Sequence, residues 1–179
     1  FGRTGDWFAA DGYGVTPDVL IMGKAIANGF PLSAVGTSRE SFSHWMPGSH
    51  GTTFGGNPVS CAASAATIES LRDVVPQVRH KSEHAFKRLN ELKAAHPTIG
   101  DVRGRGQMIG IEFVDENGEP NPTGLDFVRA SALEQGMFIL TAGPDFNIIR
   151  FIPPLVASIE EIDYGIDILD KALTAYEAA

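Results

Sequence analysis

The chain has 179 residues, and its 22 acidic and 14 basic side chains give a formal net charge of −8. This charge excludes a general binder of nucleic acids, because such proteins gather cations against phosphates. With 43% hydrophobic and 20% charged residues, the composition excludes a disordered or fibrous protein. The single cysteine, Cys61, cannot form an internal disulfide, and no apolar stretch nears the roughly 20 residues that cross a bilayer. We therefore expect a globular protein of the cytoplasm.

The first elements are predicted from a short apolar block. Residues Val19–Met22 follow Pro17-Asp18 and end at Gly23-Lys24, and their length and β-branching favour a buried strand. The glycine-rich stretch that follows predicts loops, with one further strand near 33–36. The first part of the chain therefore reads as an α/β piece that cannot close a sheet by itself.

Two helices are predicted in the middle of the chain. Asn57 is a good N-cap and Pro58 a good first residue for one helix. Pro76 opens a second helix, whose apolar face carries Val78, Ala85, Leu89 and Leu92 and which stops before His96-Pro97.

The last part of the chain predicts an α+β unit. Strand alternation covers 108–114, a helix covers 125–135, and strands lie near 137–140 and 148–152. The final helix begins with a capping box of Ser158 and Glu161 and repeats apolar residues at spacings of three and four. The predicted order is strand, helix, strand, strand, helix. Residues 97–179 carry 14 acidic and 5 basic groups, unlike the nearly neutral first 60, which supports two different parts.

Lys24 is the first candidate for chemistry. A lysine just outside a buried strand is partly desolvated, which lowers its pKa and frees the amine to attack a carbonyl group. The alternative is an ordinary surface lysine. A Walker phosphate loop is excluded, because Asp18 stands where its first glycine is needed and Ala25 where its hydroxyl is needed.

Two other segments could bind anions. Residues 49–58 place hydroxyls and glycines before a helix N-terminus, which suits a phosphate, although a flexible loop is the alternative. Arg150 has four apolar neighbours, so it should be buried and need a carboxylate partner from either the protein or a substrate.

Two further patterns carry no chemistry. The Gly104-Arg105-Gly106 segment misses the dinucleotide fingerprint and precedes a strand. The histidines and the cysteine show no ligand spacing beyond His80 and His84, so no metal site is expected.

Three segments together resemble the second half of class-III pyridoxal-phosphate-dependent aminotransferases. Residues 1–35 have Pro-Asp, the apolar block, Gly-Lys and Asn-Gly in family order, and HGTTFGGNPVSCAA at 50–63 follows at the expected distance. Residues 149–155 resemble the C-terminal motif of the family. The implied fold is α/β, the type I fold of these transferases. Residues 1–96 would be the end of the cofactor-binding large domain with a connecting helix, and 97–179 an α+β small domain.

The resemblance also implies residue roles. Lys24 would be the Schiff-base lysine that holds pyridoxal 5′-phosphate and later shuttles a proton. Thr53 would offer its hydroxyl to the cofactor phosphate in the neighbouring subunit, which implies a homodimer with a shared active site. Arg150 would bind the carboxylate of an amino acid or 2-oxo acid. The run GKAIANGFPL at 23–32 resembles members that act on ω-amino acids such as 4-aminobutyrate. We therefore expect a transaminase that moves an amino group to a 2-oxo acid.

Some family features are missing from the sequence. Family members carry an acidic partner for the pyridine nitrogen, a glycine-rich turn and a stacking aromatic upstream of the Phe-Gly-Arg-Thr-Gly segment. We therefore expect that these 179 residues are a fragment and do not catalyse transamination alone. A decarboxylase, an isomerase or an aminomutase of the same fold remains an alternative, as does a non-catalytic dimerisation module. The presence of Lys24, Thr53 and Arg150 together favours an enzyme.

Overall fold

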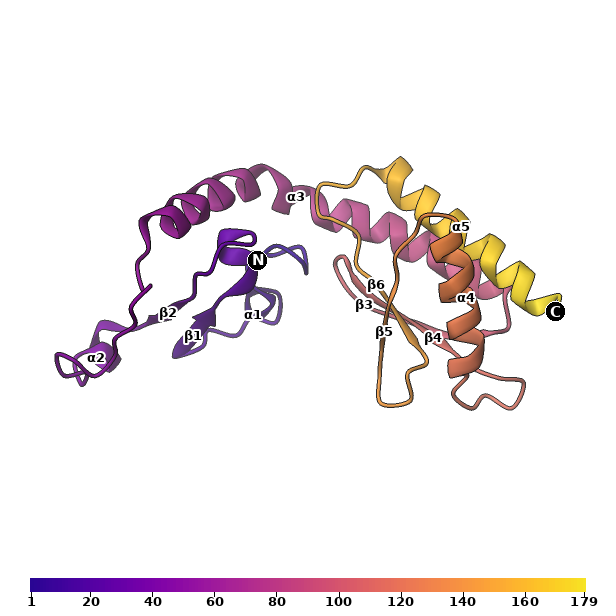
Figure 1. Cartoon of the computed structure of the whole chain (residues 1–179), viewed down its shortest axis with the longest axis horizontal. Coiled ribbons are helices and arrows are strands. Elements are labelled where there is room, and N and C mark those ends of the chain that lie inside the picture. Colours follow the sequence, from indigo (N-terminus) through magenta and orange to yellow (C-terminus); the bar gives the residue numbers. More distant parts are fainter.

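The computed structural model describes all 179 residues as two lobes spanned by one long helix (Figure 1). The elements in chain order are α1 (Ala9–Gly12), β1 (Val19–Met22), η1 (Lys24–Ala27, a 3₁₀ helix), β2 (Ala34–Thr37), α2 (Arg39–Phe42), α3 (Pro58–Ala95), β3 (Ile99–Arg105), β4 (Met108–Phe113), α4 (Pro122–Glu134), β5 (Leu140–Ala142), β6 (Ile148–Phe151) and α5 (Ile159–Glu177). None of the helices combines the length and apolar character that a membrane crossing requires.

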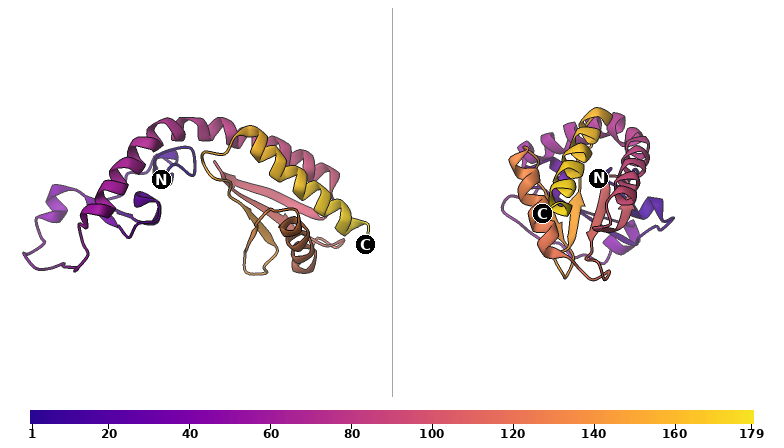
Figure 2. Two further views of the ribbon diagram at one scale, coloured as in Figure 1. Left: turned by 45° about the horizontal axis from the view of Figure 1, so that its top comes forward. Right: turned by 90° about the vertical axis from the view of Figure 1, so that its right-hand side faces the viewer.

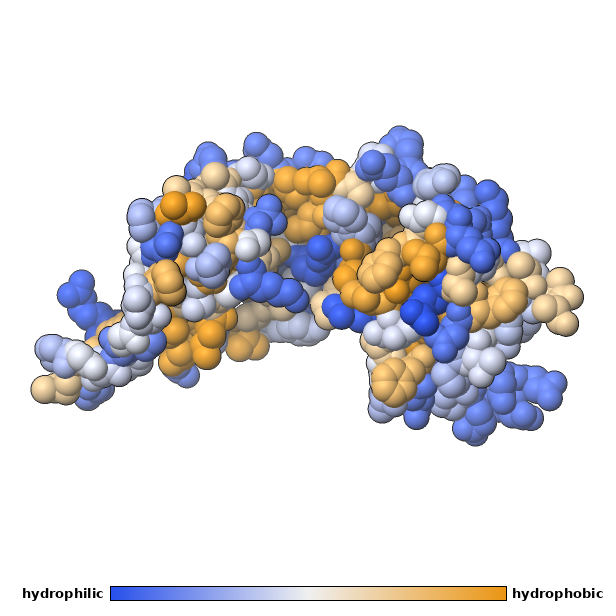
Figure 3. Space-filling view, in the orientation of Figure 1, coloured by the Kyte–Doolittle hydropathy of each residue, from blue (hydrophilic) through white to orange (hydrophobic).

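The first lobe contains a sheet of only two strands. The predicted strands are confirmed, since β1 and β2 pair antiparallel with Met22 opposite Ala34. The expected burial of β1 is wrong, because Ile21 is 78% exposed and Val19 is also exposed. The two strands have no third neighbour, and β1 alternates exposed with half-buried residues, so one of its faces is open. Figure 3 shows hydrophobic residues on the surface of this lobe.

Helix α3 is continuous over 38 residues. Its predicted start is confirmed, because the Asn57 Oδ1 atom accepts hydrogen bonds from the backbone N–H groups of Val59 and Ser60. A separate helix beginning at Pro76 was wrong, since Pro76 lies inside α3. Proline removes one helical hydrogen bond and crowds the preceding turn, which bends a helix without having to end it. Figure 2 shows α3 as a curved helix.

The second lobe is a four-stranded antiparallel sheet in the order β3-β4-β6-β5. The predicted β4, β6 and α5 are confirmed, but β3 was missed. Strand β3 has two glycines, three charged residues and only two apolar residues, Ile99 and Val102, so it lacks the apolar alternation by which a strand is predicted. The strand predicted at 137–140 begins instead at Leu140, and α4 begins at Pro122 behind an Asn121 cap, three residues before its predicted start.

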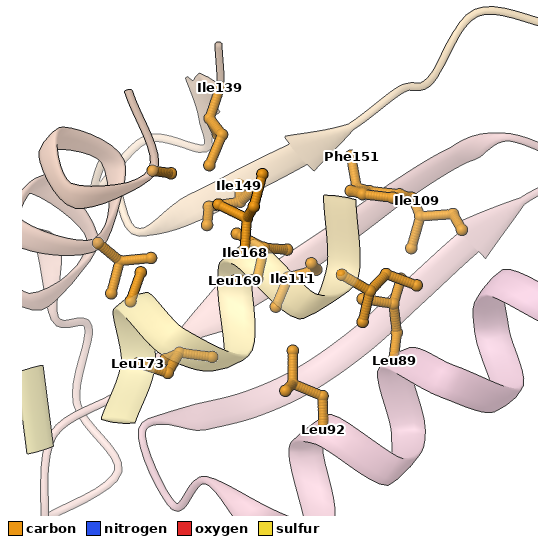
Figure 4. Close-up of a cluster of buried hydrophobic side chains, with 14 of the residues drawn as sticks. Leu89, Leu92, Ile109, Ile111, Ile139, Ile149, Phe151, Ile168, Leu169 and Leu173 are labelled. Atoms are coloured by element: carbon orange, nitrogen blue, oxygen red, sulfur yellow. The ribbon is translucent and has the colours of Figure 1, made fainter. Parts of the chain in front are cut away.

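The core of this lobe lies between one sheet face and the helices. Helices α4 and α5 and the second half of α3 cover that face, where β4 and β6 contribute alternate residues (Figure 4). The capping box predicted for α5 is present, with reciprocal hydrogen bonds between Ser158 and Glu161. Fully buried core side chains include Leu89, Ile109, Ile111, Ile149, Leu169 and Leu173.

The turn between β3 and β4 fastens the N-terminal segment to the second lobe. The backbone N–H of Gln107 donates to the carbonyl oxygen of Arg3 at 2.9 Å, and the Arg105 guanidinium donates to the carbonyl oxygen of Gly12 at 2.6 Å. Gly106 has φ +57°, and a Cβ there would lie 2.5 Å from the Arg3 carbonyl oxygen. The glycine-rich segment discounted as a nucleotide motif is therefore the contact between two distant parts of the chain.

We expect Gly106→Ala to lower the free energy of unfolding by about 1–3 kcal/mol, because strained backbone and a close contact add together. Gly118→Ala is the matched control, since Gly118 has φ +82° but open space around its missing Cβ. Urea denaturation of both variants measures the difference. Equal losses for the two variants would show that the contact with Arg3 contributes nothing.

The end of α3 is joined to α5 by a buried histidine. The Nδ1 and Nε2 atoms of His96 lie 2.7 Å from carboxylate oxygens of Glu177 and Asp170 respectively. Burial alone lowers the pKa of His96, but hydrogen bonds to Asp170 and Glu177 outweigh it and hold this pKa above its ordinary value of 6.5. Burial likewise raises the pKa of Glu177, but bonds from Thr98 and His96 hold it below 4.5.

These shifts predict a pH dependence of stability. Because the pKa of His96 is raised in the folded state, its contribution to stability is fully present below pH 6.5. That contribution is lost as pH rises through the folded-state pKa. Because the pKa of Glu177 is lowered in the folded state, its contribution to stability is fully present above pH 4.5. That contribution is lost as pH falls through the folded-state pKa. We therefore expect the free energy of unfolding to fall more steeply above pH 6.5 in the native protein than in His96→Gln.

The measurement is denaturant unfolding at several pH values. At pH 6 the His96→Gln variant should lose about 1–3 kcal/mol, because buried charge-assisted hydrogen bonds are removed. His80→Gln is the control, since His80 is exposed on α3. Identical alkaline slopes in the native protein and His96→Gln would contradict the prediction.

Candidate functional site

Lys24 is the first residue of η1 and follows β1 through Gly23. Ile26 and Ala27 are buried and η1 packs against α3, so the segment is held while the lysine side chain stays exposed. The expected desolvation of Lys24 is therefore not found in this chain, because the residue is exposed. Its φ of +53° is unusual for a residue with a side chain, and such outliers gather at functional sites. The Nζ atom makes no ion pair or hydrogen bond within the chain, which leaves the amine free to react.

Thr53 lies in the exposed loop between α2 and α3. Its hydroxyl has no hydrogen-bond partner in the chain. The first N–H groups of α3 are less available to a phosphate than expected, because Asn57 already accepts from Val59 and Ser60. The loop therefore offers a hydroxyl donor more readily than the helix end itself.

Arg150 lies in β6, opposite Gly110 of β4 on one side and Leu140 of β5 on the other. It is half-buried, less than the predicted full burial, because its side of the sheet faces away from the helices. Of the four arginines in residues 97–179, the other three form ion pairs and Arg150 forms none. The protein carboxylate that was one of its two expected partners is therefore absent from this chain.

A groove of about 450 Å³ opens between α5 and the segments around β5 and β6, and Arg150 is among its lining residues. Its walls are mostly apolar, with Phe138, Ile152 and Tyr164 among them. Glu161 is the other charged residue of the lining, and its carboxylate accepts the Ser158 N–H of the capping box. Arg150 is thus the lining charge with no partner in the chain.

The chain does not bring its three candidates into one contact. Lys24 belongs to the first lobe and Arg150 to the second, with α3 spanning the two (Figure 1). Thr53 lies in the loop that leads into α3, at the end of that helix away from the second lobe. The donor set nevertheless fits pyridoxal 5′-phosphate, since a free amine suits its aldehyde and a free hydroxyl suits its phosphate.

No group of three or more potential metal ligands is found in the structure. His84, half of the histidine pair noted in the sequence, instead contacts the Asp163 carboxylate of α5 at 2.7 Å. That side chain serves the packing of α3 on α5.

Sequence reasoning missed two charged residues next to Arg150. Arg103 and Glu112 share its face of the sheet, but without β3 their register could not be assigned. The signal that could have found them is charge alternation through Asp101, Arg103 and Arg105, which has the period of a strand with one polar face.

Comparison with known proteins places this architecture in a family. The family model described as aminotransferase class-III matches residues 1–173. The 4-aminobutyrate aminotransferase of Mycobacterium leprae is 41% identical over 97% of this chain and 40% of its own length. The alanine/serine racemase of Pyrococcus horikoshii is 38% identical over 96% of this chain and 36% of its own length.

Solved structures of transaminases are also similar to this chain. An S-selective transaminase from Arthrobacter sp. matches with a TM-score of 0.90 at 31% identity, covering 100% of this chain and 43% of that one. The two lobes are therefore part of a fold-type-I transferase. The chain belongs to the class-III aminotransferase family, which depends on pyridoxal phosphate. It spans about 40% of the length of the M. leprae relative.

Proposed function

We propose that the complete protein containing this chain is a transaminase that moves an amino group from an amino acid or an ω-amino acid, such as 4-aminobutyrate, to a 2-oxo acid. The observation that carries the proposal is the free amine of Lys24, in a motif that resembles the family's lysine segment, within a chain matched over residues 1–173. The name of the M. leprae relative supports the ω-amino acid class.

In this reaction, Lys24 and Arg150 have different roles. Pyridoxal phosphate, when bound, supplies the electron sink for the substrate carbon. Lys24 carries the cofactor, and its freed Nζ atom takes the proton from the substrate carbon that bears the amino group. Arg150 binds the substrate carboxylate through two parallel hydrogen bonds and so orients that carbon.

We also propose that the protein works as a homodimer in which Thr53 binds the cofactor phosphate of the neighbouring subunit. The exposed position of Thr53 supports this role, and so do the exposed apolar side chains of the same region, Trp45, Met46 and Phe54. An apolar surface of this kind fits a subunit interface.

The test is an assay of the complete protein with pyridoxal phosphate, a panel of amino donors and the acceptors pyruvate and 2-oxoglutarate. Transfer of the amino group to the acceptor supports the proposal. Release of CO₂, racemised donor or a shifted amino group without transfer would assign a decarboxylase, a racemase or an aminomutase instead. The family admits other reactions, as the name of the P. horikoshii relative shows.

Residues 1–179 alone should give no measurable transfer in the same assay. The chain supplies no acidic partner for the pyridine nitrogen at the position implied by the family, and without it the cofactor is a weaker electron sink. Turnover by the isolated chain comparable with that of the complete protein would contradict this expectation.

A further inference from the structure

The face of the four-stranded sheet opposite the core carries several charged residues. Strand alternation places Ile109, Ile111 and Phe113 of β4 in the core, so Gly110 and Glu112 lie on the opposite face. Pairing extends this face to β3 and β6. Arg103 is opposite Gly110 on one side, and Arg150 is opposite Gly110 on the other.

Glu112 therefore has a similar relation to two arginines. It lies two residues from Gly110 on β4, which makes it a diagonal neighbour of Arg103 and of Arg150 alike. Long side chains reach each other across such diagonals. Gly110 itself has no side chain, and the Ile148 Cγ2 atom lies 3.3 Å from where its Cβ would be, so the two long side chains would have to meet above Ile148. Glu112 could thus pair with either arginine.

The structure shows which pairing is made. The Nη1 atom of Arg103 donates to the Glu112 carboxylate and, at 3.0 Å, to the Asp101 carboxylate. The hydrogen bonds that Arg103 donates to Glu112 and then to Asp101 raise the pKa of Arg103, and the bond from Arg103 lowers the pKa of Asp101. Lys93 supports Asp101 from α3 at 3.6 Å. Arg150 is left with no carboxylate.

We propose that Arg103 is a positioning residue that holds Glu112 away from Arg150 and so keeps Arg150 available for the substrate carboxylate. This inference rests on the proposed function and adds a residue that determines acceptance of carboxylate substrates. Without Arg103, the Glu112 carboxylate turns to its other diagonal neighbour, Arg150, which has no ion pair in the chain. The substrate then has to displace an ion pair of the protein before it can bind.

The kinetic test uses the complete enzyme with two acceptors, pyruvate and butanal, which lacks a carboxylate. Arg103→Met should raise KM for pyruvate roughly tenfold, with kcat nearly unchanged, because a half-exposed ion pair competes with the substrate. KM for butanal should stay within about twofold. The double variant Arg103→Met/Glu112→Gln should restore KM for pyruvate, since the Glu112 carboxylate is gone and Asp101 keeps its ion pair with Lys93.

Arg129→Met is the matched control, because Arg129 also pairs with one carboxylate but lies on α4. An unchanged KM for pyruvate in Arg103→Met, or no rescue by the double variant, would overturn the inference.

A structural readout separates this inference from the proposed function. A crystal structure of Arg103→Met should show the Glu112 carboxylate within 4 Å of the Arg150 guanidinium. If Glu112 stays turned towards β3 or solvent, the inference fails whatever the activity. If Glu112 has moved but the native protein transfers no amino group, the proposed function fails while the relation between the three side chains stands.

Discussion

Lys24→Ala should lower the transamination rate of the complete protein at least about 1,000-fold, because the variant loses the proposed attachment point for the cofactor and the proposed base. Stability should change little, since the side chain is exposed and makes no ion pair or hydrogen bond within the chain. The free energy of unfolding is therefore expected to stay within about 0.5 kcal/mol of the native value. Steady-state assays with one amino donor and pyruvate measure the loss.

Lys171→Ala is the control for this change, since Lys171 is another exposed lysine, on α5. Borohydride reduction of the protein with pyridoxal phosphate, followed by peptide mapping, should place the label on Lys24 in the native protein. The other lysines, Lys81, Lys87, Lys93 and Lys171, should stay unlabelled. Native turnover in Lys24→Ala would remove the catalytic role and favour the non-catalytic dimerisation module.

Arg150→Met should raise KM for pyruvate about 100-fold, because it removes the two charge-assisted hydrogen bonds proposed to hold the substrate carboxylate. Butanal has no carboxylate for Arg150 to bind, so its KM should stay within about threefold of the native one. Arg150 makes no ion pair in the chain, so no buried carboxylate is left unpaired by the change. The ratio of kcat/KM for the two acceptors is the measured quantity.

Arg129→Met again serves as a control that removes an arginine from the same lobe without touching the sheet. An equal loss for pyruvate and butanal would mean that Arg150 supports the fold rather than the substrate. Arg150→Met should lose kcat/KM for pyruvate selectively, and Arg103→Met should show a smaller loss that the double variant reverses. Together these results would show that Arg150 binds the substrate and that Arg103 only positions Glu112.

Local signals in the sequence were sufficient to predict much of the secondary structure of the second lobe. The caps at Asn57 and Ser158 and the alternation of β4 were predicted, because each depends on residues a few positions apart. Pro76 was misread for the same reason. A proline removes one helical hydrogen bond at its own position. Whether α3 continues depends on the turns on both sides of Pro76 and on the buried side chains of Val75 and Val78.

The sequence by itself determined the family resemblance and the three candidate residues Lys24, Thr53 and Arg150, since these lie in short motifs readable in order. Only the tertiary structure decided which charges pair. Glu112 can reach an arginine on either neighbouring strand, and the register of β3 and β6 against β4 sets that choice. Register depends on burying a whole face of the sheet against distant helices, so residues 40 positions apart decide together whether Arg150 is free.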